Sequence, residues 1–269
     1  MYATDFIYDG INLSDFGCII CEFDSSGGVN EVASGVPLTI KTVARNKGNR
    51  WSIADTGYDS SLEITFDICK DPCVFEPDEM TFDDELYLNL VRWLVREDFL
   101  ETVFIDDRQL VRRHYNGTFN VTKLTIADEI CGLRVVFTTD KPYAFGDEIS
   151  DSHRYASDGT WNFFDKSFII CTTKPKVKIK CRASGNLTIS NSFTGSTVVI
   201  KGVTNGETIE MDGEAMTITS SLDAHDIWND FNYEFLKVGN SYNNRINPIS
   251  VNLACNMTIS YQPIIRDAP

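Results

Sequence analysis

The sequence predicts a mainly β fold in two domains, a split β-barrel-like domain with one α-helix followed by a β-sandwich. Short runs that alternate between apolar and polar residues recur along the chain, separated by Gly, Asn and Asp, as in half-buried strands joined by turns. Only one segment has the three- and four-residue apolar spacing of a helix. With 269 residues, 42% of them hydrophobic, the chain is long enough to build two cores.

A β-hairpin is predicted at the beginning of the chain. Asp9-Gly10 stands between the apolar runs 6–8 and 11–13, and Asp-Gly favours the tight turn of a two-residue hairpin. Residues 62–68 later alternate strictly between apolar and polar, which predicts a strand with one buried face.

Between these segments the sequence is typical of a long exposed hairpin or arm. The strand-like run 38–44 leads into a basic stretch and then an aromatic residue. Cations beside an aromatic ring make good interface anchors, and a mobile surface loop is the alternative interpretation. The candidate interface residues are Arg45, Lys47, Arg50 and Trp51.

One helix is predicted at about 82–98. Thr81 and Asp84 have the spacing of a capping box, and Arg92 and Arg96 fall in the expected last turn, where cations interact favourably with the helix dipole. An apolar stripe wide enough to cover one side of a sheet or barrel runs along the segment. The stripe consists of Phe82, Leu86, Leu90, Trp93 and Leu94.

The chain returns to β structure after the helix, and a domain boundary is predicted near residue 147. Pro142, Gly146 and the polar run 147–152 mark that boundary. From residue 168 onward, short strands alternate with turn signals about every ten residues, a pattern typical of a β-sandwich. We therefore expect a first domain at 1–147 and a second at 148–269.

Charge is distributed unevenly between the two halves. Residues 1–150 contain 27 acidic and 13 basic side chains, whereas residues 151–269 contain 12 and 11. The formal charge of -15 disfavours nucleic-acid or anionic-membrane binding by simple attraction. The asymmetry indicates either two modules in different surroundings or an acidic face that aids solubility.

The patterns of common enzymes are absent from the sequence. It has no G-x-S-x-G, no H-E-x-x-H, no phosphate-binding loop and no dinucleotide fingerprint. We therefore predict no catalytic residue and no cofactor. Two alternatives stay open, a carbohydrate-binding module that attaches to cell-wall glycans and, with less support, a glycosidase, whose paired carboxylates leave no local signature.

The eight cysteines are expected to be reduced, partly buried thiols, because nothing at the N-terminus resembles an export signal. Zinc is a weaker possibility. Two close pairs, Cys18 with Cys21 and Cys69 with Cys73, could supply four thiolates. If residues 18–21 form a strand, however, the first pair points to opposite faces.

Several segments, taken in order, resemble the distal tail protein family of bacteriophages that infect mainly Gram-positive bacteria. The first-domain segments are Phe6-Ile7-Tyr8-Asp9-Gly10, Ser14-Asp15-Phe16-Gly17, Trp93-Leu94, Thr102-Val103-Phe104-Ile105-Asp106-Asp107 and Phe137-Thr138-Thr139-Asp140-Lys141-Pro142-Tyr143-Ala144. In the second half they are Lys174-Pro175-Lys176-Val177-Lys178-Ile179, Leu187-Thr188-Ile189-Ser190-Asn191, Gly206-Glu207-Thr208-Ile209-Glu210-Met211-Asp212, Lys237-Val238-Gly239-Asn240 and Thr258-Ile259-Ser260-Tyr261.

This resemblance implies a galectin-like second domain and a structural subunit of the virion tail, made in the host cytoplasm. It implies a homohexameric ring that contacts the major tail tube protein on one side and the hub or tail-associated lysin on the other. Receptor-binding or peripheral baseplate proteins are further implied partners, whereas DNA would only pass through the ring and no membrane is involved. Sugar binding is not implied, because the His-x-Asn-x-Arg and Trp-x-x-Glu-x-Arg patterns of galectins are missing.

Overall fold

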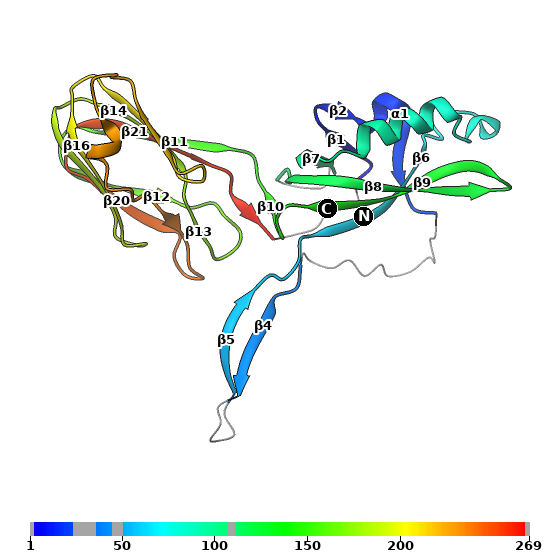
Figure 1. Cartoon of the computed structure of the whole chain (residues 1–269), viewed down its shortest axis with the longest axis horizontal. Helices are drawn as coiled ribbons and strands as arrows, with labels where there is room; N and C mark the ends of the chain where they lie inside the picture. Colours follow the sequence, from blue (N-terminus) through cyan, green and yellow to red (C-terminus); the bar gives the residue numbers. More distant parts are fainter. Residues whose placement is uncertain (1–2, 24–35, 45–50, 107–110, 267–269) are drawn as a thin grey trace. The chain divides into compact units, whose positions relative to one another are not determined.

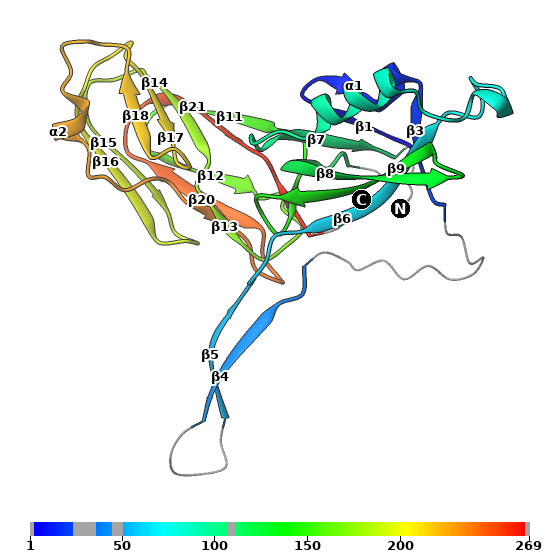
Figure 2. The ribbon, with the colours of Figure 1, turned by 45° about the vertical axis from the view of Figure 1, so that its right-hand side comes forward.

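The computed structural model describes residues 3–23, 36–44, 51–106 and 111–266 and confirms the mainly β class. The chain divides into two compact units, Met1–Gly146 together with the C-terminal residues from Ile265, and Asp147–Ile264 (Figures 1 and 2). The polar run at 147–152 does not form a linker, because a strand already begins at Ile149.

The first unit is built on a nine-stranded sheet whose main path has the order β2-β1-β7-β8-β9-β6-β3. This path is open, so the described strands do not close into a barrel. Its strands are β1 (Asp5–Tyr8), β2 (Ile11–Asn12), β3 (Cys18–Cys21), β6 (Glu63–Lys70), β7 (Leu100–Ile105), β8 (His114–Ile126) and β9 (Glu129–Thr139), with β10 (Ala144–Phe145) and β22 (Ile264–Ile265) off the path.

The predicted opening hairpin is confirmed. β1 pairs with β2 so that Tyr8 lies opposite Ile11, and Asp9 and Gly10 between them have φ angles of 53° and 74°. These positive φ angles define the tight turn for which Asp-Gly is suited. Two short 3-10 helices, η1 (Leu13–Phe16) and η2 (Pro77–Glu79), occur elsewhere in the first unit.

The predicted helix is present but shorter than expected, as α1 (Asp84–Leu94). It begins late because the side chain of Asp83 accepts a hydrogen bond from the backbone N–H of Leu86 at 2.7 Å, while the backbone of Phe82 bridges to Ile130 in β9. It ends where Val95 takes an extended conformation. Asp83, rather than Thr81, is therefore the capping residue.

The apolar stripe of α1 packs on a cluster of aromatic rings from the sheet. Trp93 stacks on Phe6 with 5.4 Å between ring centroids, and Phe6 stacks on Phe119 at 5.3 Å. The indole N–H of Trp93 also donates to the carbonyl oxygen of Tyr8 at 3.1 Å. Trp93 therefore joins the helix to both the core and the backbone of β1.

The second unit is the expected β-sandwich, with sheets of the order β11-β21-β14-β17-β18 and β12-β20-β15-β16. Apolar residues from both sheets form one buried core. Its elements are β11 (Ile149–Tyr155), β12 (Gly159–Phe164), β13 (Thr172–Thr173), β14 (Lys176–Cys181), β15 (Gly185–Asn191), β16 (Ser196–Val203), β17 (Thr208–Asp212), β18 (Thr217–Ser220), α2 (Ile227–Asp230), β19 (Val238–Gly239), β20 (Ile246–Val251) and β21 (Cys255–Tyr261).

Substituting Trp93 by alanine should destabilise the first unit by about 3–5 kcal/mol, because it removes a buried ring and a hydrogen bond at once. Chemical denaturation of the full chain would measure the loss in the transition of that unit. Leu88→Ala on the same helix is the matched control, since this side chain is 61% exposed, and it should change stability by less than about 0.5 kcal/mol. Equal effects from the two variants would contradict this view of the core.

Candidate assembly interface

A separate two-stranded hairpin occupies the segment for which the sequence predicts an arm. β4 (Thr39–Ala44) pairs with β5 (Trp51–Gly57), and neither pairs with any other strand in the described part of the chain. The register shifts between Lys41 and Thr42. We refer to β4 and β5 together as the arm, which leaves the nine-stranded sheet at the start of β6 (Figures 1 and 2).

Apolar side chains are exposed on the arm and beside it. Ile40 in β4 is 57% exposed, and Leu38 just before that strand is 51% exposed. Lys41 Nζ on the arm lies 3.6 Å from Oδ1 of Asp59, just after the arm, and both side chains are exposed. Such a surface ion pair contributes little to stability. An isolated two-stranded hairpin is marginally stable in water, so these features favour a role in contact with another surface.

The base of the arm is fixed to the first unit. Val36, just before the arm, is buried in the core, and Leu62 just after it is buried as well. Arg266 donates from Nη2 to the carbonyl oxygen of Val36 at 3.1 Å, and its guanidinium lies 5.9 Å from the ring centroid of Tyr58. Both ends of the arm are therefore held against the first unit.

Of the four interface candidates, only Trp51 falls within the described residues. Arg45, Lys47 and Arg50 lie outside the described residues. The backbone of Trp51 begins β5 opposite Ala44. Their role in contact with a partner stays a prediction.

Exposed acidic residues gather between β6 and α1. Residues 71–85 contain seven acidic and no basic side chains, and six of those acids are exposed while Asp71 is partly buried. Much of the acidity of the first unit is therefore concentrated in one surface segment.

The four cysteines considered for zinc do not form one set. Cys18 faces the core, where burial raises the pKa of its thiol to about 12, whereas Cys21 points to the other face of β3. A hydrogen bond between the Cys21 and Cys69 side chains raises the pKa of Cys21 and lowers that of Cys69. Cys73 is exposed. No group of three or more potential metal ligands occurs among residues 3–23, 36–44, 51–106 and 111–266.

A buried histidine–carboxylate pair, His225 and Glu207, lies in the second unit. His225 Nδ1 lies 2.5 Å from Glu207 Oε1, and Ser220 Oγ donates to the same oxygen at 2.6 Å. His225 Nε2 is 3.0 Å from the carbonyl oxygen of Lys201. Both ring nitrogens are thus engaged in structural contacts. Local sequence could not identify Glu207 as the partner, because it lies 18 residues away on another turn.

Burial alone would lower the pKa of His225 and raise that of Glu207, but the contacts between them act in the opposite direction. Hydrogen bonding and the charge of Glu207 outweigh burial and raise the pKa of His225. Hydrogen bonds from Ser220, His225 and the backbone of Thr204 outweigh burial at Glu207 and lower its pKa. The pair therefore favours its charged form.

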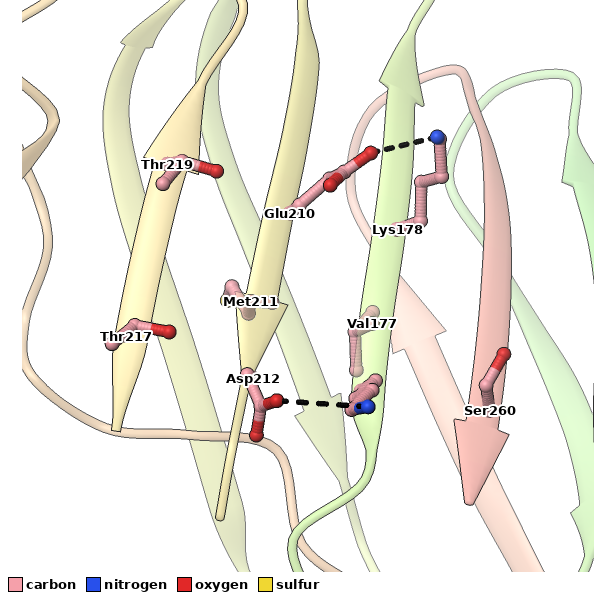
Figure 3. A pocket seen from close by; sticks show the side chains of 9 residues that line it. Val177, Lys178, Glu210, Met211, Asp212, Thr217, Thr219 and Ser260 are labelled. Atoms are coloured by element: carbon pink, nitrogen blue, oxygen red, sulfur yellow. Dashed lines mark ion pairs between the residues drawn. The ribbon is translucent and has the colours of Figure 1, made fainter. Parts of the chain in front are cut away.

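The exposed face of the five-stranded sheet contains a shallow groove of about 440 Å³ (Figure 3). Two ion pairs cross it from β14 to β17, Lys178 Nζ with Glu210 Oε1 at 2.7 Å and Lys176 Nζ with Asp212 Oδ2 at 3.9 Å. None of its lining residues is aromatic, so it lacks the ring platform expected for sugar stacking. The lining residues are Lys176, Val177, Lys178, Glu210, Met211, Asp212, Thr217, Thr219 and Ser260.

Two family models match the chain and cover nearly its whole length. Residues 1–141 match the phage tail protein N-terminal domain, and residues 143–261 match the phage tail C-terminal domain. The chain therefore belongs to this phage tail protein family. A comparison with curated proteins gives no significant match. In the described part of the chain, no helix is long and apolar enough to span a bilayer.

One solved structure shows the same fold. The Dit protein of phage SPP1, described as a paradigm of the hub adsorption apparatus in phages that infect Gram-positive bacteria, superposes with a TM-score of 0.67 and 12% identity, covering 96% of this chain and 98% of that one. A chain of the phage P2 baseplate in its activated conformation with calcium covers 97% and 98% at 11% identity, with a TM-score of 0.43.

Replacing His225 by glutamine should destabilise the second unit most between pH 4.5 and 6.5. Because the pKa of His225 is raised in the folded state, its contribution to the free energy of unfolding is complete below pH 6.5, the unfolded-state pKa. That contribution is lost as the pH rises through the folded-state pKa. Because the pKa of Glu207 is lowered, its contribution to the free energy of unfolding is complete above pH 4.5. That contribution is lost as the pH falls through the folded-state pKa. Thermal unfolding across pH would measure the difference. Ala224→Ser, an exposed neighbouring change, should have little effect at any pH.

Proposed function

We propose that this phage tail protein forms a hexameric ring that joins the tail tube to the host-adsorption apparatus. The observation that carries the proposal is the fold likeness to SPP1 Dit over nearly the full length of both chains, together with membership of the phage tail protein family. The arm supports it, because a projecting hairpin with exposed apolar residues suits contact between subunits. The role is structural, with no chemical step assigned to any residue.

The partners of the ring are the tube protein on one face and the hub or lysin on the other, with receptor-binding or peripheral baseplate proteins attached at its periphery. The arm, including Arg45, Lys47, Arg50 and Trp51, contacts either the neighbouring subunit or the tube. The first unit lines a channel through which DNA passes during ejection. An acidic wall suits that role, because like charge keeps phosphate groups from binding as they pass.

Purified protein, alone and mixed with the tube protein, should form six-fold rings. Negative-stain imaging and native mass spectrometry would detect them, the second by a mass six times that of the 30.3 kDa chain. Because a tube end can template assembly, both samples are needed. A monomer in both would contradict the proposed ring.

Charge reversal in the acidic segment should slow DNA delivery. Glu76, Asp78 and Glu79 are all exposed, and their joint replacement by lysine would let passing phosphates bind the channel wall. Phages assembled with the variant should eject DNA more slowly in an in vitro ejection assay, and added salt should restore the rate. A matched triple reversal in the second unit, at exposed Asp158, Glu214 and Asp223, should leave ejection unchanged. Normal ejection by both variants would argue against an acidic channel wall.

A further inference from the structure

One edge of the nine-stranded sheet is only half covered. β6 pairs with β9 from Glu63 to Ile68, but on its other side β3 pairs only with Asp67–Lys70. No other strand in the described part of the chain pairs with the first half of β6. We call this uncovered stretch, residues 63–66, the open edge.

The backbone of the open edge has hydrogen-bonding groups that point away from the sheet. The N–H of Thr139 donates to the carbonyl oxygen of Leu62 at 3.0 Å, so residue 62 faces β9. In an antiparallel pair, alternate residues face alternate neighbours. Glu63 and Thr65 therefore direct their N–H and C=O groups away from β9. Asp67 and Cys69 direct theirs the same way, and there they meet β3. Among the described residues, those four outward groups have no strand partner.

The arm presents the complementary feature. β4 and β5 pair only with each other among the described strands, so each has an outer edge of its own. Ile40 and Lys41 on β4 are exposed. Charge is complementary as well, because the open edge has an exposed carboxylate at Glu63 and the described cation on β4 is Lys41.

We infer that the arm of one copy adds as a strand to the open edge of β6 in the next copy, beside β3. This inference rests on the proposed ring and names the partner of the arm within it. Strand addition supplies main-chain hydrogen bonds to the outward groups of Glu63 and Thr65 and provides the arm with a sheet to join. Because the donor arm and the receiving edge are different surfaces of one chain, the contact is head-to-tail, the type of contact that forms a ring when the rotation between successive copies closes.

Hydrogen exchange tests the contact on the unmodified protein. In rings, the amides of Glu63 and Thr65 should exchange at least about tenfold more slowly than in a variant whose arm, residues 39–57, is replaced by a short Gly-Ser linker. Mass spectrometry with residue-level fragmentation reads these two amides separately from Ile64 and Phe66, which already face β9 and serve as internal controls. The arm-deleted variant should remain folded and monomeric.

A backbone substitution provides a second measurement. Thr65→Pro removes one outward N–H that has no strand partner among the described residues, as is tolerated at a sheet edge, and should weaken ring assembly by about five- to tenfold at each contact. Thr65→Val keeps the N–H and should assemble normally. If Thr65→Pro does not fold, the exchange experiment alone decides.

The outcomes separate this inference from the proposed function. Rings in which Glu63 and Thr65 remain as accessible to exchange as in the arm-deleted variant would overturn strand addition and leave the ring intact. Rings formed equally well by the arm-deleted variant would also overturn strand addition while leaving the proposed ring in place. Absence of rings in every sample, with and without the tube protein, would overturn both.

Discussion

The requirement that backbone N–H and C=O groups find partners governs this molecule. In the second unit, backbone groups pair within two sheets that pack on a shared core. In the first unit, α1 covers one face of the sheet while hydrogen bonds run from β2 across to β3. Every described sheet has edges whose outward groups no strand pairs with, and two of these edges, those of the arm and of the first half of β6, lie in adjacent stretches of the sequence.

Local physical chemistry predicts most of the fold. Asp9-Gly10 predicts a turn because both residues accept positive φ, and the stripe ending at Trp93 and Leu94 identifies the buried face of α1. The limits of the helix are less predictable, since they depend on Phe82 being held by Ile130, almost fifty residues away. The start of β11 is not predicted, because Ser150, Asp151 and Ser152 are part of a polar run whose composition indicates only a boundary between domains.

The candidate interface is likewise predictable from the sequence only in part. The composition of residues 38–51 predicts an arm, because an apolar run beside basic residues has no use in a core. No local pattern reveals that the arm is isolated, that Cys21 meets Cys69 while Cys18 turns to the core, or that Glu207 partners His225, because each depends on pairing between distant strands. Membership of the phage tail family comes from the order of many weak segments over both halves, and no single motif carries it.

The arm is inserted between two strands that pair with each other, β3 and β6, and its base is held by Val36, Tyr58 and Leu62. Its strands can therefore change in length or composition while the hydrophobic core stays as it is. In the proposed ring, variation in the arm would therefore change which neighbouring surface it fits while the core residues stay the same. Under the proposed strand addition, sequence differences in this one segment would keep the subunits of related phages from mixing when they share a host cell.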